Sequence, residues 1–176
     1  MIYEFGGIKP KIHPSAFVVP SADVIGDVTI GENSSIWFNV TVRGDVNTIR
    51  IGKNTNIQDN SCLHVTHKFA SLTLGDGITV GHSVTLHGCI VKNGALIGMG
   101  AVVLDNAEIG EEAFVAAGAV VTPNTKIPPR SLVVGSPAKV KRELKEEELQ
   151  FMRRNAQHYI DTFMQYRDGK FPESKG

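Results

Sequence analysis

The sequence has few cysteines, no bias of charge and no long apolar run, and each absence excludes a class of protein. Cys62 and Cys89 are the only cysteines in 176 residues, too few for a disulfide framework, which favours a reduced cytoplasmic setting. Acidic and basic side chains balance at 18 each, which argues against a nucleic-acid or anionic-membrane surface. No apolar stretch is close to the length of a membrane span, about 18 residues. The opening MIYEFGG does not resemble a secretory signal.

Aromatic residues are also scarce, and the chain is instead organised by a six-residue period. From Ile12 an aliphatic residue recurs at every sixth position, with a three-residue slip after Val42, a five-residue insertion after Leu63 and one short unit after Leu86. The twenty anchors are residues 12, 18, 24, 30, 36, 42, 51, 57, 63, 74, 80, 86, 91, 97, 103, 109, 115, 121, 127 and 133. This period fits short strands joined by bends of about 120°, three units to a coil. We therefore predict a mainly β chain, a left-handed parallel β-helix of hexapeptide repeats with about seven coils.

The repeat ends at SPAKV, residues 136–140, and a helical pattern follows it. One apolar stripe at a spacing of three to five residues is formed by Leu144, Leu149, Met152, Ala156, Tyr159, Ile160 and Phe163. We predict the β-helix over residues 1–140, an amphipathic α-helix over residues 141–170 packed along it, and a tail over residues 171–176.

Counting along the coils places two histidines on neighbouring rungs. His64 and His87 each follow an inward anchor directly and are 23 residues apart, which is one 18-residue coil plus the five-residue insertion. Arg43 precedes His64 by one coil plus the three-residue slip, so the three side chains should form a ladder with rungs about 4.8 Å apart. Two imidazoles on adjacent rungs can share a metal ion.

His82 lies on a different face, two residues after its anchor and directly above Asp59. It is therefore badly placed to join His64 and His87 of its own chain. A closed trimer could bring it against the pair of the next subunit and so complete a three-histidine site. A single outward histidine is ordinarily a solvated surface residue, and that interpretation suits His13, His67 and His158, although His67 could border the site. Both cysteines are interpreted as packing residues.

The stretches VRGDVNTIRIGKNTNIQDNSCLH, LGDGITVGHSVTLHGC and LIGMGAVVLDNAEIG resemble the γ-class carbonic anhydrase family. The resemblance is greatest to its bacterial YrdA-like, PaaY-like and ferripyochelin-binding-protein-like branch. It implies a homotrimer whose zinc, with iron or cobalt as alternatives, is bound by His64 and His87 of one subunit and His82 of its neighbour. It further implies a carbonate dehydratase, a lyase in which metal-bound hydroxide attacks carbon dioxide to give bicarbonate.

The resemblance also implies roles for other residues near the metal, and the family pattern matches Asp45 in the RGD stretch. By analogy, Arg43 pairs with Asp59 across the subunit interface, and Gln58 lies beside the metal-bound solvent. The remaining positions that match the family's site are Asn56 and Tyr159, the latter on the C-terminal helix.

The sequence departs from the archaeal members of the family at the route for protons. Those members carry a glutamate after the RGD and an acidic loop, whereas here Val46 follows Asp45 and the loop VTHKFASLT has no carboxylate. His67 is left as a substitute proton carrier, so zinc binding is more strongly predicted than rapid turnover. Three alternatives stay open: a CoA-dependent acyltransferase with a single histidine base, an acyl-CoA thioesterase, and a non-enzymatic metal-binding trimeric scaffold.

Overall fold

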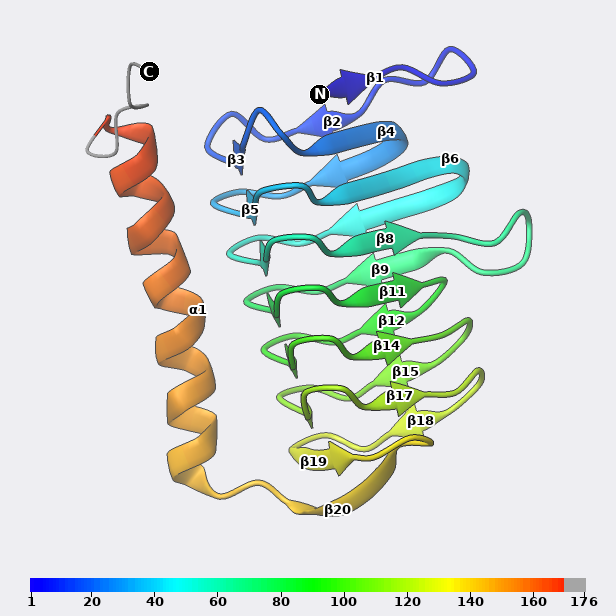
Figure 1. Cartoon of the computed structure of the whole chain (residues 1–176), viewed down its shortest axis with the longest axis vertical. Helices are drawn as coiled ribbons and strands as arrows, with labels where there is room; N and C mark the ends of the chain where they lie inside the picture. The colour runs from blue at the N-terminus through cyan, green and yellow to red at the C-terminus, as the bar shows by residue number, and fades with distance from the viewer. Residues whose placement is uncertain (170–176) are drawn as a thin grey trace.

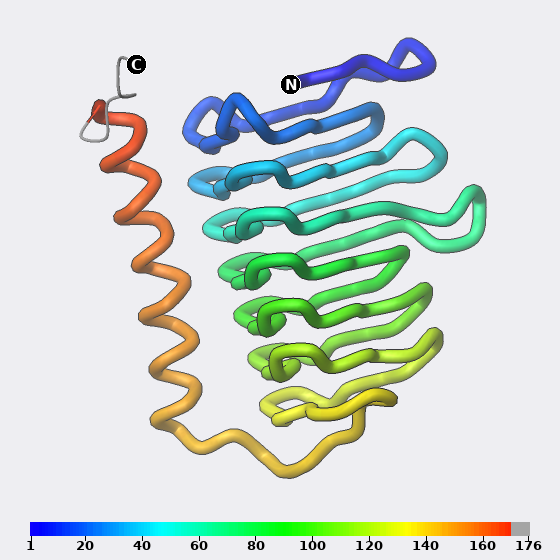
Figure 2. The backbone as a smooth tube through the Cα atoms, in the orientation of Figure 1, coloured from blue at the N-terminus to red at the C-terminus, as the bar shows by residue number. Residues whose placement is uncertain are grey.

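The chain folds into a parallel β-helix followed by one long α-helix, seen in a computed structural model that describes residues 1–169 (Figure 1). The backbone winds through about seven coils, which are stacked one on another (Figure 2). The predicted fold class is therefore confirmed. The predicted tail, residues 171–176, lies outside the described residues.

The coils have flat faces because strands of successive coils pair in parallel and in register. The first sheet covers two faces, and its long strand β6 (Thr41–Ile51) pairs with β8 through one half and with β9 through the other. Its other members are β1 (Ile2–Tyr3), β2 (Lys11–Ile12), β4 (Asp23–Ile30), β8 (Cys62–His64), β9 (Leu72–Leu74), β11 (Thr85–His87), β12 (Ile90–Val91), β14 (Val102–Val103), β15 (Glu108–Ile109), β17 (Val120–Val121) and β18 (Lys126–Ile127). The second sheet covers the third face and consists of β3 (Phe17–Val18), β5 (Ser35–Ile36), β7 (Asn56–Ile57), β10 (Thr79–Val80), β13 (Leu96–Ile97), β16 (Phe114–Val115), β19 (Ser131–Val134) and β20 (Lys139–Glu143).

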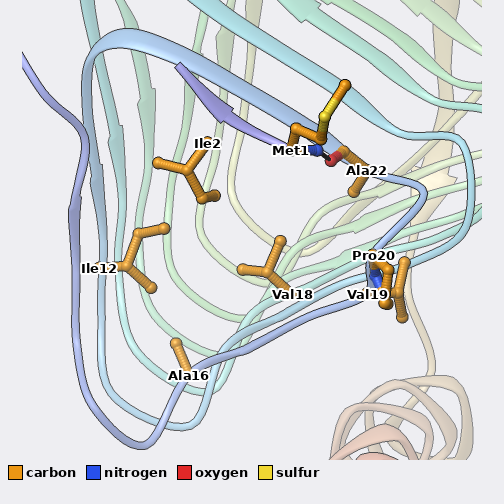
Figure 3. Close-up of a pocket in the computed structure, with 8 residues that line it drawn as sticks. All are labelled: Met1, Ile2, Ile12, Ala16, Val18, Val19, Pro20 and Ala22. Carbon is orange, nitrogen blue, oxygen red and sulfur yellow. Dashed lines mark hydrogen bonds between the residues drawn. The ribbon is translucent and has the colours of Figure 1, made fainter. Parts of the chain in front are cut away.

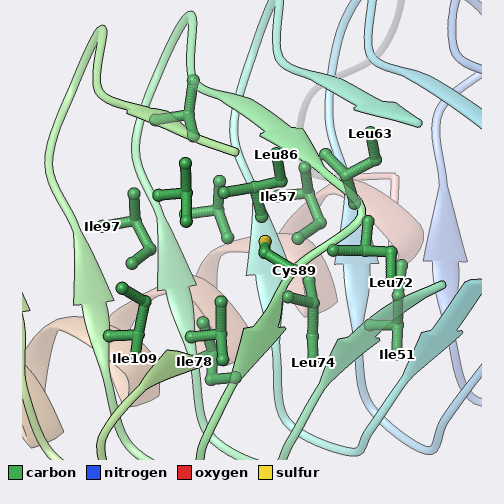
Figure 4. Packing of buried hydrophobic residues seen from close by; sticks show 14 of the residues in the cluster. Ile51, Ile57, Leu63, Leu72, Leu74, Ile78, Leu86, Cys89, Ile97 and Ile109 are labelled. Atoms are coloured by element: carbon green, nitrogen blue, oxygen red, sulfur yellow. The ribbon is translucent and has the colours of Figure 1, made fainter. Parts of the chain in front are cut away.

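The predicted anchors form the core. Eighteen of the twenty are buried in one continuous cluster, and Ile12 and Val18 are partly buried against it; Figure 4 shows part of this packing. Burying one such side chain stabilises a fold by about 1.5–3 kcal/mol, so the repeat itself accounts for the solenoid. The bends use residues such as Asn33 and Asn60, with φ of 52° and 61°, because asparagine tolerates this left-handed conformation better than β-branched residues do.

The N-terminal end of the β-helix is open. A cavity of about 300 Å³ is bounded there by apolar side chains of the first coil (Figure 3). The residues that line it are Met1, Ile2, Ile12, Ala16, Val18, Val19, Pro20 and Ala22. The amino group of Met1 donates to the carbonyl of Ala22 and forms an ion pair with Asp23.

The chain leaves the β-helix through β20, which pairs antiparallel with β19. The helix α1 (Glu146–Arg167) consequently begins five residues later than predicted, because residues 139–143 hydrogen-bond as a last strand instead of starting the helix. Its start is stabilised by the Glu148 carboxylate, which accepts the backbone N–H of Lys145, and by acidic residues in the first turn. No helix within residues 1–169 is long and apolar enough to cross a membrane.

The helix packs along the second sheet, against β5, β7 and β10, as predicted. The buried members of the predicted stripe are Leu144, Leu149, Met152, Ala156 and Phe163. Phe163 is fully buried and stacks on Phe17 with a centroid distance of 5.7 Å. Tyr159 and Ile160 are half-buried. The helix therefore runs beside the coils over most of their height (Figure 1).

Candidate metal centre

Two histidines face each other on neighbouring strands. The strands β8 and β11 pair with His64 opposite His87, which is the register that counting along the coils predicts. Nδ1 of His64 lies 3.1 Å from Nε2 of His87. Two nitrogens bound to one tetrahedral zinc ion at about 2.0–2.1 Å are roughly 3.4 Å apart, so this pair is spaced almost as two ligands of one ion are.

The other nitrogen of each ring contacts a carboxylate. Nε2 of His64 lies 3.1 Å from Oδ1 of Asp45, and Nδ1 of His87 lies 2.7 Å from Oδ1 of Asp105. An ionised carboxylate only accepts hydrogen bonds, so in each ring this nitrogen carries the proton. The two facing nitrogens then both present lone pairs, an arrangement that a shared cation makes favourable. Metal-binding histidines in proteins are oriented in this way, so the residues fit a metal ion.

Burial and the charge of Arg43 favour the neutral form of the His64 ring. Nη1 of Arg43 lies 2.6 Å from Oδ2 of Asp45. Burial would raise the pKa of Asp45, but hydrogen bonds from Arg43 and His64 outweigh it and hold the pKa below its ordinary value. Burial lowers the pKa of His64, and the charge of Arg43 lowers it further, against the opposing effect of Asp45. A neutral imidazole is the form that binds metal.

His82 lies apart from this pair. It follows β10 in the sheet that α1 covers, whereas β8 and β11 belong to the other sheet. Its Nδ1 lies 2.9 Å from Oδ2 of Asp59, so Asp59 orients this ring as the other carboxylates orient theirs. Within residues 1–169, no group of three or more His, Cys, Asp or Glu side chains is arranged to hold a metal ion. His82 therefore lies on a different sheet from His64 and His87 within one chain.

The other residues that the sequence singles out lie on the His82 side. Asn56 and Gln58 are buried, and Nε2 of Gln58 donates to Oδ1 of Asn56. Burial raises the pKa of the Tyr159 phenol, and the charge of Asp59 nearby raises it further, so this hydroxyl keeps its proton. A groove of about 190 Å³ lies between α1 and the coils, and the residues that line it include Gln58, Gly81, Leu96, Met99, Phe151 and Asn155.

One expectation concerns a second subunit and stays a prediction, and another, the packing of Cys62, is wrong. Arg43 pairs with Asp45 of its own chain, and Asp59 pairs with His82, so a pairing of Arg43 with Asp59 across an interface stays a prediction. Cys62 is exposed rather than packed, because it precedes the inward anchor Leu63 and points outward. Cys89 is fully buried, as expected, and burial raises the pKa of its thiol to about 12.

Asp105 was missed by sequence reasoning. Thr85 pairs with Val102, so the coil above His87 is 17 residues long and stacks Asp105 on Gly88, beside His87. The short unit LHGCI carried this signal, because it shortens the coil by one residue. His67 is exposed in the loop, and the structure gives it no hydrogen-bond or ion-pair partner among residues 1–169.

The chain is similar to a known protein family, to curated proteins and to a solved structure. Residues 88–123 match the family described as bacterial transferase hexapeptide (six repeats). The chain is 50% identical to a carbonic anhydrase of Geobacillus kaustophilus over 167 residues. This alignment covers 95% of this chain and 91% of that protein. It is 46% identical over 158 residues to the mitochondrial gamma carbonic anhydrase 2 of Arabidopsis thaliana, covering 87% of this chain but 57% of the longer plant protein. A solved structure from Bacillus cereus, described as a candidate acetyltransferase, matches with a TM-score of 0.93 and 47% identity, covering 95% of this chain and 96% of that one.

Proposed function

Because this chain belongs to the γ-class carbonic anhydrase family of hexapeptide-repeat proteins, we propose that it hydrates carbon dioxide to bicarbonate at zinc sites shared between the subunits of a homotrimer. The observation that carries the proposal is the pair of facing nitrogens on His64 and His87, each ring held from behind by a carboxylate. His82, held in the same way but on another sheet, supplies the third ligand to the next subunit. The low cysteine count supports a cytoplasmic location.

In this proposal the protein holds the metal through neutral imidazoles. Three such ligands suit zinc, with iron or cobalt as alternatives. When bound, zinc acts as a Lewis acid that lowers the pKa of a water molecule to about 7 and so supplies the nucleophile for carbon dioxide. Asp45, Asp59 and Asp105 keep the proton on the far nitrogen of each ring, which leaves the near nitrogen free to bind.

The His82 side supplies the surroundings in which substrate would bind. Carbon dioxide is apolar, and the groove beside Gly81 is lined mainly by apolar side chains. Nε2 of Gln58 donates to Oδ1 of Asn56, whereas Oε1 accepts no hydrogen bond from residues 1–169. Oε1 can therefore accept a hydrogen bond from water and orient it. The protonated hydroxyl of Tyr159, near Asp59, is a hydrogen-bond donor on the same side of the β-helix as Gln58. Arg43 stabilises the Asp45 carboxylate, which orients His64.

Proton removal limits the expected rate. The loop between β8 and β9 contains no carboxylate, and its His67 is exposed. A general base must lie within hydrogen-bond reach of the proton that it removes, directly or through one water. We therefore expect hydration that depends strongly on the concentration of an external buffer base.

A complementation experiment tests the shared site. The His82→Ala and His64→Ala variants are each expected to lose most of their zinc and their hydration activity. When the two variants are mixed and reassembled, each mixed trimer contains one interface with His82 from one subunit and the intact His64 and His87 pair from the other. Zinc content by elemental analysis and hydration by stopped flow should then partly recover.

The matched control is His13→Ala, because His13 is exposed near the open end of the β-helix and its ring hydrogen-bonds, among residues 1–169, only with Ser15. That variant should keep wild-type zinc and activity. A site built within one chain would show no recovery on mixing, and that result would contradict the shared site. Zinc bound without any hydration would favour the thioesterase or the scaffold.

A second candidate function is CoA-dependent acyl transfer. It is favoured by the likeness to the Bacillus cereus structure described as a candidate acetyltransferase. Acyl transfer needs one histidine base and no metal, so turnover of an acyl-CoA that survives removal of zinc by a chelator would support it. Loss of all acyl-CoA turnover when zinc is removed would exclude metal-independent acyl transfer.

A further inference from the structure

The loop between β8 and β9 is tied to the carboxylate that holds His87. Oγ1 of Thr66, at the base of this loop, donates to Oδ2 of Asp105 over 2.8 Å. The other oxygen of the same carboxylate, Oδ1, lies 2.7 Å from Nδ1 of His87. Thr66, Asp105 and His87 therefore form one continuous chain of hydrogen bonds from the loop to a proposed metal ligand.

Thr66 is itself held on its other side. Its carbonyl accepts a hydrogen bond from Nδ2 of Asn47 over 3.1 Å, and it forms an isolated bridge with Ala70 that closes the loop. Asn47 lies two residues after Asp45, the carboxylate that contacts His64. The base of the loop is thus connected to the supports of both facing histidines, while its tip extends outward from the coils (Figure 1).

We propose that Thr66 is a positioning residue: by holding Asp105 against His87, it fixes the ring tautomer in which Nε2 of His87 is unprotonated, and so couples the loop to metal affinity. The side chain of Asp105 is 22% exposed, so without the hydroxyl it can rotate toward water and release Nδ1. The His87 ring would then be free to exchange tautomers, and part of the population would carry a proton on the nitrogen that faces His64. That fraction cannot bind a metal ion without first losing the proton.

The expected change in metal affinity depends on the proposed metal site, whereas the expected change in the His87 tautomer does not. Two readouts separate them: the ring ¹⁵N chemical shifts of His87 in metal-free protein, and zinc affinity measured by competition with a chelator. The informative variants are Thr66→Val, which removes only the hydroxyl, and Thr66→Ser, which retains it. Asp105→Ala removes the carboxylate. Thr73→Val is the matched control, because Thr73 is exposed on the neighbouring strand β9.

In wild type we expect a protonated Nδ1 on His87. Thr66→Val should show a mixture of tautomers and a zinc affinity about three- to tenfold weaker, the effect of one hydrogen bond. Asp105→Ala should weaken zinc binding about ten- to a hundredfold, as loss of a carboxylate behind a ligating histidine does. Thr66→Ser and Thr73→Val should match wild type in both readouts.

A wild-type His87 protonated on Nε2 would overturn the proposal, as would a Thr66→Val variant that behaves like Thr73→Val in both readouts. Failure of Thr66→Ser to restore the wild-type tautomer would also overturn it, because the hydroxyl would then not be the cause. Tautomers that change as expected in a protein that binds no zinc would support the positioning role and contradict the proposed metal site instead.

Discussion

Asp105 stacks on Gly88 so closely that a side chain at residue 88 would displace its carboxylate. A Cβ on Gly88 would lie 2.2 Å from Oδ1 of Asp105 and 2.6 Å from Cβ of Ala70, and Gly88 has a φ of +55°. The close approach of the carboxylate therefore requires glycine, and the left-handed bend favours it. Oδ1 of Asp105 is the atom that contacts His87, so this glycine is a condition for orienting the ring.

Gly88→Ala is expected to weaken zinc binding at least about tenfold, because the new methyl group displaces Asp105 from His87. Gly100→Ala is the matched control, since Gly100 has a similar φ of +67° but no atom within 4 Å of the place that a methyl group would occupy. Both variants should lose about 1 kcal/mol of stability through the left-handed backbone, measured by chemical denaturation. Equal zinc affinity in the two, measured by chelator competition, would contradict the role of the close approach.

If the proposed zinc-linked trimer forms, removing zinc is expected to destabilise it. An ion bound to His64 and His87 of one subunit and to His82 of the partner subunit links the subunits and relieves the repulsion between facing lone pairs. At a free zinc concentration a hundred times the Kd, binding adds about 2.7 kcal/mol per site. Calorimetry with zinc and with a chelator should show a higher Tm with zinc. His82→Ala should lose most of this difference and His13→Ala should keep it; an equal response from both would argue against the third ligand.

Docking of α1 depends on Phe163. This side chain is fully buried and stacks on Phe17, so Phe163→Ala should lower the free energy of unfolding by about 3–5 kcal/mol. Phe151, on the same helix, is 50% exposed. Phe151→Ala should therefore change the free energy of unfolding by less than about 0.5 kcal/mol. Denaturant titrations followed by circular dichroism measure both. Similar small effects of the two substitutions would mean that the helix contributes little to folding.

Acid should loosen the contact between α1 and the coils through Glu112. Its carboxylate accepts from Arg153 of the helix over 2.6 Å and from Arg130 over 3.0 Å, and the hydrogen bond from Arg153 is the main reason that its pKa is lowered from 4.5. A lowered pKa in the folded state means that this contribution is present above pH 4.5 and is lost as the pH falls toward the folded value.

Wild type should therefore lose more stability between pH 5 and pH 3 (about the range in which carboxylates titrate) than Glu112→Gln does. Glu111→Gln is the control, because Glu111 is exposed and adjacent. Denaturant titrations at each pH give the comparison. A pH profile of Glu112→Gln that matches wild type would show that another carboxylate dominates acid unfolding.

Several features of the site could be predicted by counting residues, because a coil has a nearly constant length. The alignment of His64 with His87 and the position of Asp59 below His82 follow from a coil of 18 residues and one insertion. Asp105 could not be placed in this way without noticing that the coil above His87 is one residue short. The start of α1 also lies later than the local pattern predicts, because residues 139–143 pair with β19, and local patterns do not contain that neighbour.

The amino-acid sequence by itself determined the β-helix, since inward aliphatic residues at a six-residue period leave one way to bury them all. It also determined that His82 and the other two histidines occupy different faces. Only the tertiary structure decided which nitrogen of each ring is available, because that depends on carboxylates brought from other coils: Asp45 to His64, Asp59 to His82 and Asp105 to His87. A hydrogen bond is directional and short, so it depends on side-chain geometry that a repeat period does not encode.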